Sequence, residues 1–574
     1  MDLLRAEELE VRFPGRDEPI LSGVSVEFAG GKMNALVGPS GCGKTTLMRA
    51  FLGAVPYRGK CCLGEETIRV PESLVGKVGY VPQFCLAHRL LTVREVLEDT
   101  ARMHLSGPER NGVVERVLQE TSLDGIAGSR VGMLSGGQQR RLALALEMVP
   151  DPRVYLCDEV TTGLDPAAED EILSLLERLN RERGATFVNI IHNLAQLPRF
   201  DAITVLYGGG VAYSGSWTGL REWFQIEDAV DLYRALAKLP AEEWVDRWRE
   251  GAGEHGAEVE PETGRDPELP LSDRGSMEEP VKVSALATRF RGFEQFSTLM
   301  RRRLRLFFRD RAILGLTLAI TFGFPLLVVI FALDGLPAAG GLWSEGSTGG
   351  MGRLIRERFE DTLRAIENGS LVSGLILFQV ILLGLVGSNN GSREIAGERD
   401  LFEKERLRGL SVGAYVSSKL CFVGILAAGQ GLWMALFVKA VCRFPGDLFE
   451  QAVGLVLVTV AMSWICLGFS ALLKSEDRAQ LLSIYLVGFQ LPLSGIVLAL
   501  PDVLIWLFRP LISAYWGWAV YLGAFRDDPL YDAVVRVNRE VIPNFEAGVI
   551  LLGSQAIFGA ILVWLGCRQR RPVK

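Results

Sequence analysis

The chain has 574 residues, with 61 Lys and Arg against 68 Asp and Glu, so its formal net charge is −7. Hydrophobic residues make up 49% and charged residues 22%, which is too apolar for a disordered chain, and the length allows three or four domains or two large ones. The mildly acidic total argues against a nucleic-acid-binding protein, which needs a net basic face, so no nucleic acid is expected among the partners.

Residues 1–249 alternate short apolar runs with polar turns, which predicts a soluble α/β domain. The first stretch, MDLLRAEELEVRF, lacks a basic segment followed by an apolar core, so no signal peptide is expected. The nine cysteines of the chain are too few for a disulfide scaffold, and we expect them to be reduced thiols.

A phosphate-binding loop is predicted between an apolar strand at 35–37 and a helix at 46–50. Its residues fit the pattern G-x-x-x-x-G-K-[ST] in the strand–loop–helix context that this pattern requires. They are Gly38, Pro39, Ser40, Gly41, Cys42, Gly43, Lys44, Thr45 and Thr46. Glycines let backbone N–H groups point at phosphate oxygens, and the helix N-terminus adds a positive dipole. We expect Lys44 to reach the β- and γ-phosphates and Thr45 to ligate Mg²⁺.

Asp158 and Glu159 follow a second apolar strand at 154–157. Two carboxylates at the carboxyl end of a buried strand suit phosphoryl transfer, since one can hold the metal and the other can polarise water. An apolar run followed by two acids is common in itself, so this interpretation depends on the loop at 38–46. We expect Asp158 at the metal and Glu159 as the catalytic base.

A pentapeptide about twenty residues before that strand consists of Leu134, Ser135, Gly136, Gly137 and Gln138. It resembles the signature motif of ABC-type ATPases, whose α/β P-loop domain binds ATP with Mg²⁺. The resemblance implies that Gln83 is the Q-loop residue, at the metal and in catalysis, that Asp165 belongs to the D-loop, and that His192 is the catalytic switch histidine. Phe13 stands where that family has an aromatic residue that stacks on adenine, and a core position is the alternative for it.

Residues 250–283 hold ten acidic residues, several Gly and Pro and almost no bulky apolar side chains, which predicts a flexible linker. Residues 284–311 then mix aromatic and basic residues at helical spacing. That pattern predicts an amphipathic connecting helix along the cytoplasmic membrane surface, with a solvated basic helix of the soluble domain as the alternative.

The remainder, 312–574, predicts an all-α polytopic membrane domain of six transmembrane helices, because it holds six apolar segments long enough to cross about 30 Å of hydrocarbon. They lie at about 312–333, 371–388, 420–441, 452–473, 481–500 and 548–567. Arg509 and Pro510 interrupt 503–525, which favours a re-entrant or interfacial hairpin over a seventh span.

The orientation of these spans follows from their flanking charges. Lys and Arg cluster before the first span, between the second and third, and in the C-terminal tail. We therefore expect both termini and the ATPase domain in the cytoplasm, and the loop at 334–370 outside.

The order of the two domains and a further set of residues are similar to the G (White) subfamily of ABC transporters and its bacterial ABC-2-type relatives. The residues are Tyr80-Val81-Pro82-Gln83, Leu91-Thr92-Val93-Arg94-Glu95, Glu147, Tyr213-Ser214-Gly215, Arg309-Asp310, Glu398-Arg399, Glu405-Arg406 and Tyr415. Three features depart from the subfamily pattern: Val160 in place of Pro, His192-Asn193-Leu194 in place of His-Gln-Pro, and a long 334–370 loop. These departures leave the subgroup and the substrate open.

This resemblance implies an integral protein of the bacterial inner (plasma) membrane that pairs with a second half-transporter subunit, expected to be identical. Each ATP would lie between the 38–46 loop of one subunit and the 134–138 motif of the other, and the loop at 389–419 would carry the motion to the spans. The expected function is ATP-driven export of a lipid-like or amphipathic compound, with membrane lipid as a partner. The alternatives are an exporter of a polysaccharide or peptide, or a mechanical regulator of an envelope partner; a soluble ABC protein is nearly excluded by the spans.

Glutamines inside the predicted spans are costly in hydrocarbon and are candidates for the transport pathway. Gln379 and Gln490 are the favoured pair, because spans two and five line the central cavity in the resembling family. Hydrogen bonding between helices is the alternative for each of them.

Overall fold

The computed structural model describes residues 3–13, 15, 18–68, 71–105, 109–255, 285–332, 351–497, 501–538 and 542–569. The chain divides into two compact units. The first contains the chain up to Thr298 together with Asp400–Ser411, and the second contains Leu299–Arg399 and Val412–Gln569.

Two β-sheets organise the first unit. A six-stranded sheet has the order β10-β9-β3-β8-β7-β6, in which β10 pairs antiparallel with β9 and the other pairs are parallel. A second, antiparallel sheet has the order β2-β1-β4-β5. The strands are β1 (Leu4–Val11), β2 (Leu21–Phe28), β3 (Met33–Val37), β4 (Arg58–Leu63), β5 (Glu66–Thr67), β6 (Val78–Val81), β7 (Val154–Cys157), β8 (Thr186–Ile190), β9 (Ala202–Tyr207) and β10 (Gly210–Gly215).

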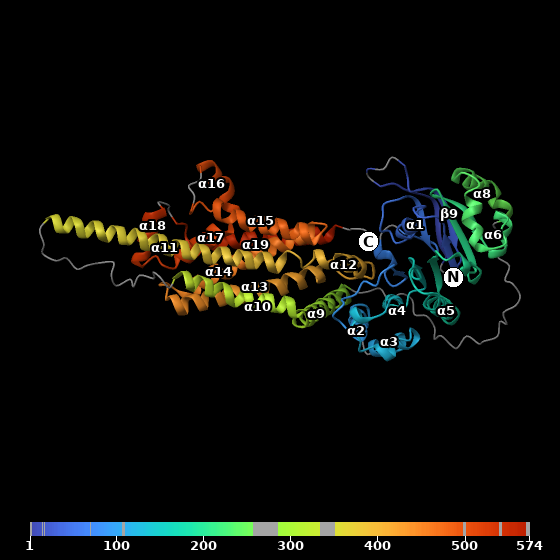
Figure 1. Ribbon diagram of the computed structural model, residues 1–574, viewed down its shortest axis with the longest axis horizontal. Helices are drawn as coiled ribbons and strands as arrows, with labels where there is room; N and C mark the ends of the chain where they lie inside the picture. The colour runs from blue at the N-terminus through green and yellow to red at the C-terminus, as the bar shows by residue number, and fades with distance from the viewer. Residues whose placement is uncertain are drawn as a thin grey trace. The chain divides into compact units, whose positions relative to one another are not determined.

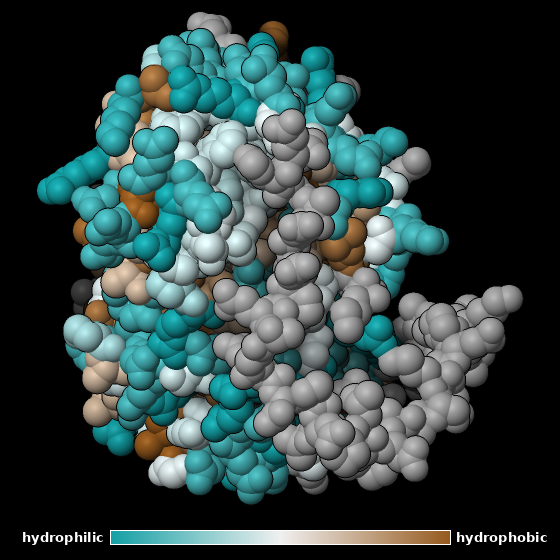
Figure 2. Space-filling view, turned by 90° about the vertical axis from the view of Figure 1, so that its right-hand side faces the viewer, coloured by the Kyte–Doolittle hydropathy of each residue, from teal (hydrophilic) through white to brown (hydrophobic). Residues whose placement is uncertain are grey.

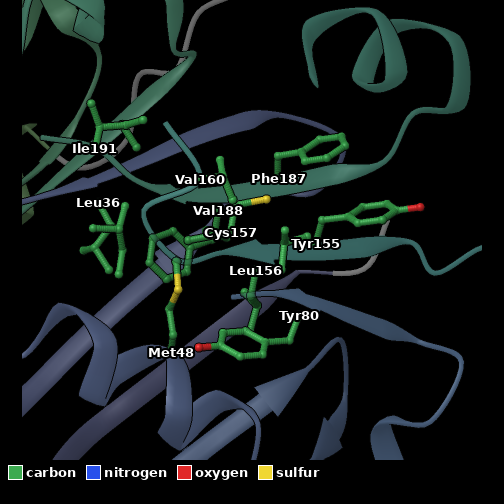
Figure 3. Packing of buried hydrophobic residues seen from close by; sticks show 14 of the residues in the cluster. Leu36, Met48, Tyr80, Tyr155, Leu156, Cys157, Val160, Phe187, Val188 and Ile191 are labelled. Atoms are coloured by element: carbon green, nitrogen blue, oxygen red, sulfur yellow. The ribbon is translucent and has the colours of Figure 1, made fainter. Parts of the chain in front are cut away.

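The central strands of the larger sheet are buried because helices cover the sheet. Every residue of β3, β7 and β8 is buried, which is typical of a parallel sheet covered on both faces. The rings of Tyr155 and Phe187 stack in this core, with centroids 4.8 Å apart (Figure 3). The helices are α1 (Lys44–Phe51), α2 (Val93–His104), α3 (Glu109–Glu120), α4 (Gly136–Met148), α5 (Pro166–Arg183), α6 (Trp217–Phe224), α7 (Leu232–Leu236), α8 (Ala241–His255), the start of α9 (Ala285–Arg309) and most of α12 (Arg399–Leu407).

Helices α6 and α8 lie beside β9 and β10 (Figure 1). The face that carries them is mainly hydrophilic where its residues are described (Figure 2). The linker predicted from residue 250 begins later, because α8 continues to His255. Buried Trp244 and Trp248 anchor this helix on the core, so it extends past the point where the composition changes. The rest of the predicted linker, 256–283, lies outside the described residues.

One segment of the first unit is distant in sequence from the rest. Asp400–Ser411 follows the second predicted span, and it packs within the first unit. The side chain of Gln295 in α9 donates from Nε2 to the carbonyl oxygens of Gly409 (3.2 Å) and Met103 (3.4 Å) and accepts at Oε1 from the backbone N–H of Ser411 (3.0 Å). One buried amide therefore joins this segment to the end of α2.

The second unit is helical throughout its described part. Helices α11, α13, α14 and α19 lie alongside one another (Figure 1). Large apolar side chains such as Phe322, Ile425 and Ile557 are exposed on these and neighbouring helices, as expected for a surface in contact with lipid. The helices are α10 (Arg311–Ala332), α11 (Met351–Gly391), α13 (Val412–Cys442), α14 (Leu448–Leu472), α15 (Glu476–Leu493), α16 (Asp502–Phe508), α17 (Ser513–Gly523), α18 (Pro529–Asn538) and α19 (Phe545–Arg568), with the end of α9.

Five candidate membrane spans are found among the described helices, or six if one bent pair is a single span. They are Arg311–Ala332, Ile366–Leu407, Val412–Cys442, Leu448–Leu472 and Phe545–Arg568, and each contains or overlaps a predicted span. The bent pair is Val503–Leu511 with Ser513–Gly523, which meet at 82°. The sequence predicted an interruption of 503–525 at Arg509 and Pro510; these residues form a 3₁₀ turn, and the bend follows it at Ile512.

The remaining predicted span, 481–500, overlaps α15, but this helix has other bounds and a shorter apolar part than the prediction gave it. This helix begins at Glu476 with three charged residues and ends at Leu493, so its apolar part is shorter than the other spans. It is not among the five helices that are long and apolar enough to cross the membrane.

The loop predicted at 334–370 is largely helical where it is described. Helix α11 begins at Met351 and has 41 residues, so the predicted span at 371–388 is only part of it. Charged residues between 353 and 367 end the apolar pattern, but Arg, Glu and Leu are good helix formers, so the helix itself continues. Residues 334–350 lie outside the described part.

Candidate functional site

The loop at 38–46 connects β3 to α1, as predicted. Gly38 has φ +152°, and a Cβ atom there would meet the carbonyl oxygen of Leu206 at 2.1 Å, so no other residue fits. Gly43 adopts the left-handed conformation at the N-cap of α1. The backbone N–H groups at the start of α1 therefore face the loop without a side-chain cap, which is the arrangement that binds phosphate oxygens.

The ammonium group of Lys44 lies inside this loop. Its Nζ donates hydrogen bonds to the carbonyl oxygens of Gly38 (2.7 Å) and Pro39 (3.0 Å), and the residue is only 6% exposed. A buried ammonium group needs acceptors, and here the loop itself supplies them. The positive charge is thus held at the place where the sequence predicted phosphates.

Asp158 lies at the carboxyl end of β7 and contacts the loop through Thr45. The Thr45 hydroxyl donates to Oδ1 of Asp158 at 3.1 Å, and the Tyr80 hydroxyl donates to Oδ2 at 2.9 Å. Burial raises the pKa of Asp158, and the hydrogen bonds from Tyr80 and Thr45 limit the rise. A hydroxyl and a carboxylate oxygen in contact suit Mg²⁺, which keeps several waters and shares its coordination with phosphates.

No group of three or more His, Cys, Asp or Glu side chains that could hold a metal ion is found among the described residues.

Glu159, Gln83 and His192 meet at the same edge of the sheet. Nε2 of Gln83 donates to Oε2 of Glu159 at 3.0 Å, and Nε2 of His192 lies 2.7 Å from Oε1. Each of the three follows its strand by two residues, and β6, β7 and β8 are parallel neighbours. Glu159 itself has φ +54°, a conformation rare for a residue with a side chain, and such strain is concentrated at functional sites.

The 134–138 motif forms the N-terminus of α4. Ser135 is the N-cap, its Oγ accepts from the backbone N–H of Gln138 (3.4 Å), and Oε1 of Gln138 accepts from the N–H of Ser135 (3.0 Å). This capping box orders the turn while Ser135 and Gly136 stay exposed. Gly137 lies beside Ala168, in the first turn of α5, whose N-cap is Asp165. The two predicted motifs are therefore neighbours on the surface.

Phe13 is half-buried and packs against the apolar core of the first unit. Its two interpretations, adenine stacking and core packing, both agree with this position.

Two tyrosines at the site were not identified from the sequence as site residues. Tyr80 contacts Asp158, as described above, and the hydroxyl of Tyr233 in α7 donates to the carbonyl oxygen of Gly38 at 3.2 Å. That carbonyl also accepts from Lys44. Tyr80 was visible in the sequence only as part of the segment before Gln83, and no pattern joins Tyr233 to a loop 195 residues away.

The two favoured pathway glutamines are buried inside the second unit, Gln379 at 0% and Gln490 at 2% exposure. Oε1 of Gln490 accepts from the backbone N–H of Ala514 at 3.0 Å. Both amide atoms of Gln379 lack a hydrogen-bond partner among the described residues. The two positions therefore differ in part: Gln490 joins two helices through Oε1, although its Nε2 also lacks a partner among the described residues, whereas neither amide atom of Gln379 has one.

A parallel α/β sheet with a phosphate loop and paired acids at one edge defines a P-loop nucleotide-binding protein. The ABC transporter family model matches residues 21–162, and the ABC-2 type transporter model matches residues 294–518. The chain belongs to the ABC transporter family, with an ABC ATPase domain preceding an ABC-2 type membrane domain, and it is an integral membrane protein.

Three relatives illustrate the similarity. The ABC transporter ATP-binding/permease protein Rv1747 of Mycobacterium tuberculosis is 29% identical over 495 residues, which cover 83% of this chain and 52% of that protein. ABC transporter G family member 28 of Arabidopsis thaliana is 32% identical over 231 residues, covering 38% of this chain and 21% of the relative. The phosphonates import ATP-binding protein PhnC of Trichormus variabilis is 30% identical over 237 residues, covering 39% of this chain and 97% of that protein. The chain thus spans about half the length of the mycobacterial relative.

Proposed function

We propose that this protein is an ATP-driven exporter of a lipid-like or amphipathic compound, built as a dimer of half-transporter subunits. The observation that carries the ATPase part is the meeting of Gln83, Glu159 and His192 at the sheet edge that also bears the 38–46 loop. The order of the ATPase and membrane domains, shared with the G subfamily, supports the transport part.

ATP binding uses the 38–46 loop. Lys44 exchanges the carbonyl oxygens of Gly38 and Pro39 for the β- and γ-phosphate oxygens, which are stronger acceptors because they are charged. Thr45 and Asp158 would hold Mg²⁺, with Gln83 nearby, and the ion would neutralise part of the phosphate charge. Phe13 provides the face on which adenine stacks.

Hydrolysis depends on Glu159 as general base for the attacking water. Both of its carboxylate oxygens have a partner, Gln83 on one side and His192 on the other. Such a carboxylate keeps one orientation, so the proton acceptor is positioned before the reaction begins.

The 134–138 motif acts on the ATP bound by the other subunit of the dimer. The exposure of Ser135 and Gly136 at a helix N-terminus supports this role, because an anion can approach the Ser135 hydroxyl and the backbone N–H of Gly136 from solvent. Asp165, beside this motif, would lie in the same subunit interface.

We further propose an ATPase domain at 1–255, which includes all of α8, a linker at 256–283, a connecting helix at 284–311 and a membrane domain at 312–574. The ATPase domain and both termini are cytoplasmic in this proposal, and the membrane is the bacterial inner membrane. The clusters of Arg and Lys on one side of the spans support this orientation. Gln379 and Gln490 are proposed to line the pathway.

The test is ATP turnover by the purified protein in lipid nanodiscs, with and without candidate lipids. We expect vanadate-sensitive hydrolysis that rises with the transported class of lipid. Lys44→Ala removes the phosphate-binding charge and should abolish turnover, a loss of about 100-fold or more. Turnover within a few-fold of the parent protein would show that the 38–46 loop is not the working site. Stimulation by polysaccharide or peptide alone would exclude the lipid-like substrate.

A further inference from the structure

Tyr80 in β6 makes two polar contacts that point in different directions. Its hydroxyl donates to Oδ2 of Asp158 at 2.9 Å, and its backbone carbonyl accepts from Nζ of Lys404 at 3.0 Å. Tyr80 is 6% exposed, and Lys404 is 2% exposed. One buried residue therefore contacts both the proposed metal site and helix α12.

Helix α12 is held at this place by a buried charge cluster. Nζ of Lys404 lies 3.0 Å from Oε1 of Glu147, and Nε of Arg408 donates to the same oxygen at 2.9 Å. Glu147 is 1% exposed. Burial by itself raises the pKa of Glu147, but Arg408 and Lys404 outweigh it and hold the pKa below its usual value. The carboxylate therefore stays charged and anchors both cations.

The contacts of Lys404 depend on Tyr80. A buried ammonium group needs several acceptors, and Glu147 supplies one of them. The Tyr80 carbonyl supplies a second. The preceding residue, Gly79, lies against Glu147 of the same cluster. A Cβ atom at position 79 would be only 3.2 Å from Cβ of Glu147. The backbone of β6 at 79–80 is thus fixed against α12.

The other end of the connection is equally well defined. Tyr80 is the register partner of Leu156 in β7, and the backbone N–H of Asp158 donates to the carbonyl oxygen of Val81 at 2.9 Å. Figure 3 shows the Tyr80 ring within the core near Leu156, with its hydroxyl directed toward Met48 of α1. A packed ring has little rotamer freedom, so its hydroxyl moves with the β6 backbone.

We propose that Tyr80 is a positioning residue: it links the docking of α12 at Lys404 to the orientation of the Asp158 carboxylate, and so to the affinity of the site for Mg²⁺. With Oδ2 held by the tyrosine, Oδ1 faces Thr45 and is presented to the metal. This inference rests on the proposed ATPase function. Helix α12 follows the second predicted span. The link through Tyr80 would therefore let a movement of that span change the affinity of the site for Mg²⁺.

The experiment measures ATPase activity of the full chain in nanodiscs as a function of Mg²⁺ at saturating ATP. Tyr80→Phe keeps the ring and removes the hydroxyl. We expect the Mg²⁺ concentration for half-maximal activity to rise about 10-fold or more, the weight of one hydrogen bond to a charged group. The nucleotide affinity, measured with a fluorescent ATP analogue without metal, should stay within twofold.

Tyr155→Phe is the matched control. Tyr155 lies in β7, in the same core, and is 1% exposed, but its hydroxyl has no hydrogen-bond partner among the described residues. This variant should keep the parent's Mg²⁺ dependence. A shift equal to that of Tyr80→Phe would assign the effect to loss of any core hydroxyl and would overturn the proposal.

Lys404→Met tests the link to α12. It removes the donor to the Tyr80 carbonyl, while Arg408 still pairs with Glu147, so the cluster stays neutralised. We expect it to raise the Mg²⁺ requirement as well, and the double variant with Tyr80→Phe to show less than the product of the two effects. Independent effects that multiply would refute the link.

The outcomes separate this inference from the proposed function. If the parent protein has no Lys44-dependent ATPase activity, the proposed function fails. If the parent is active and Tyr80→Phe has an unchanged Mg²⁺ dependence, the function stands and the role of Tyr80 is refuted.

Discussion

Nε2 of His192 lies 2.7 Å from Oε1 of Glu159, although the two residues follow different strands, β8 and β7. Gln83, after β6, donates to the other oxygen of the same carboxylate. Because three neighbouring parallel strands end together, two side chains from distant parts of the chain contact the carboxylate of a third.

Glu159→Gln should slow hydrolysis about 100- to 1,000-fold, because an amide can still hydrogen-bond water but cannot accept its proton. Asp158 and Thr45 are unchanged, so ATP should still bind. The measurement is single-turnover hydrolysis together with equilibrium ATP binding. Normal turnover in the variant would exclude Glu159 as the base.

The same variant tests the dimer. With hydrolysis blocked, the ATPase domains should stay closed, so cysteines placed at the exposed residues Ser40 and Ser135 should crosslink between subunits only when ATP is present. The control is Glu159→Gln with only its nine native cysteines, none of which forms a disulfide bond among the described residues. ATP binding without any intersubunit crosslink would contradict the composite site.

Tyr233→Phe should raise the KM for ATP about 2- to 10-fold and leave kcat nearly unchanged. The Gly38 carbonyl accepts from both Lys44 and Tyr233, and only Tyr233 remains when Lys44 turns to the phosphates. Loss of one neutral hydrogen bond is worth about 0.5–1.5 kcal/mol. Tyr57→Phe is the control, since Tyr57 donates to the Ile68 carbonyl, outside the loop. Equal KM values for all three proteins would refute this role.

The stability of the first unit should fall as the pH drops from about 6.5 toward 4, partly through His104. Burial, with Arg408 and Arg291 nearby, lowers the pKa of His104 to about 4, while Glu405 and Glu147 act in the opposite direction. The unfolded chain then binds a proton in this window that the folded chain does not, so stability is lost on acidification. In thermal unfolding between pH 7 and 5, His104→Gln should lose less stability than the parent. An identical loss in both would rule out this contribution.

Gln379→Met should distinguish the pathway role from a structural one. Both amide atoms of Gln379 are buried without partners among the described residues, so a thioether of similar shape should not lower the unfolding temperature. A pathway residue should lose lipid stimulation of the ATPase while basal turnover remains. Gln490→Met is the comparison, because Gln490 accepts from Ala514 and its replacement should destabilise the protein. Full lipid stimulation in Gln379→Met would remove it from the pathway.

The sequence by itself determined the local chemistry of this protein. The loop at 38–46, the Asp158-Glu159 pair and the 134–138 motif are contiguous, and their backbone conformations follow from their own glycines and caps. The apolar spans are equally local, because each must satisfy its own backbone hydrogen bonds in lipid. Where charge ended the apolar pattern, as before residue 371 or at the start of α15, hydropathy did not give the helix bounds.

Only the tertiary structure decided which residues that are distant in the sequence contact one another. Tyr80 contacts Asp158 because β6 pairs with β7 in one register, and Tyr233 contacts Gly38 because α7 packs near the end of β3. The burial of Glu147 between Lys404 and Arg408 joins residues more than 250 positions apart. Such contacts depend on strand register and helix packing summed over the whole unit, and no local pattern of residue types encodes them.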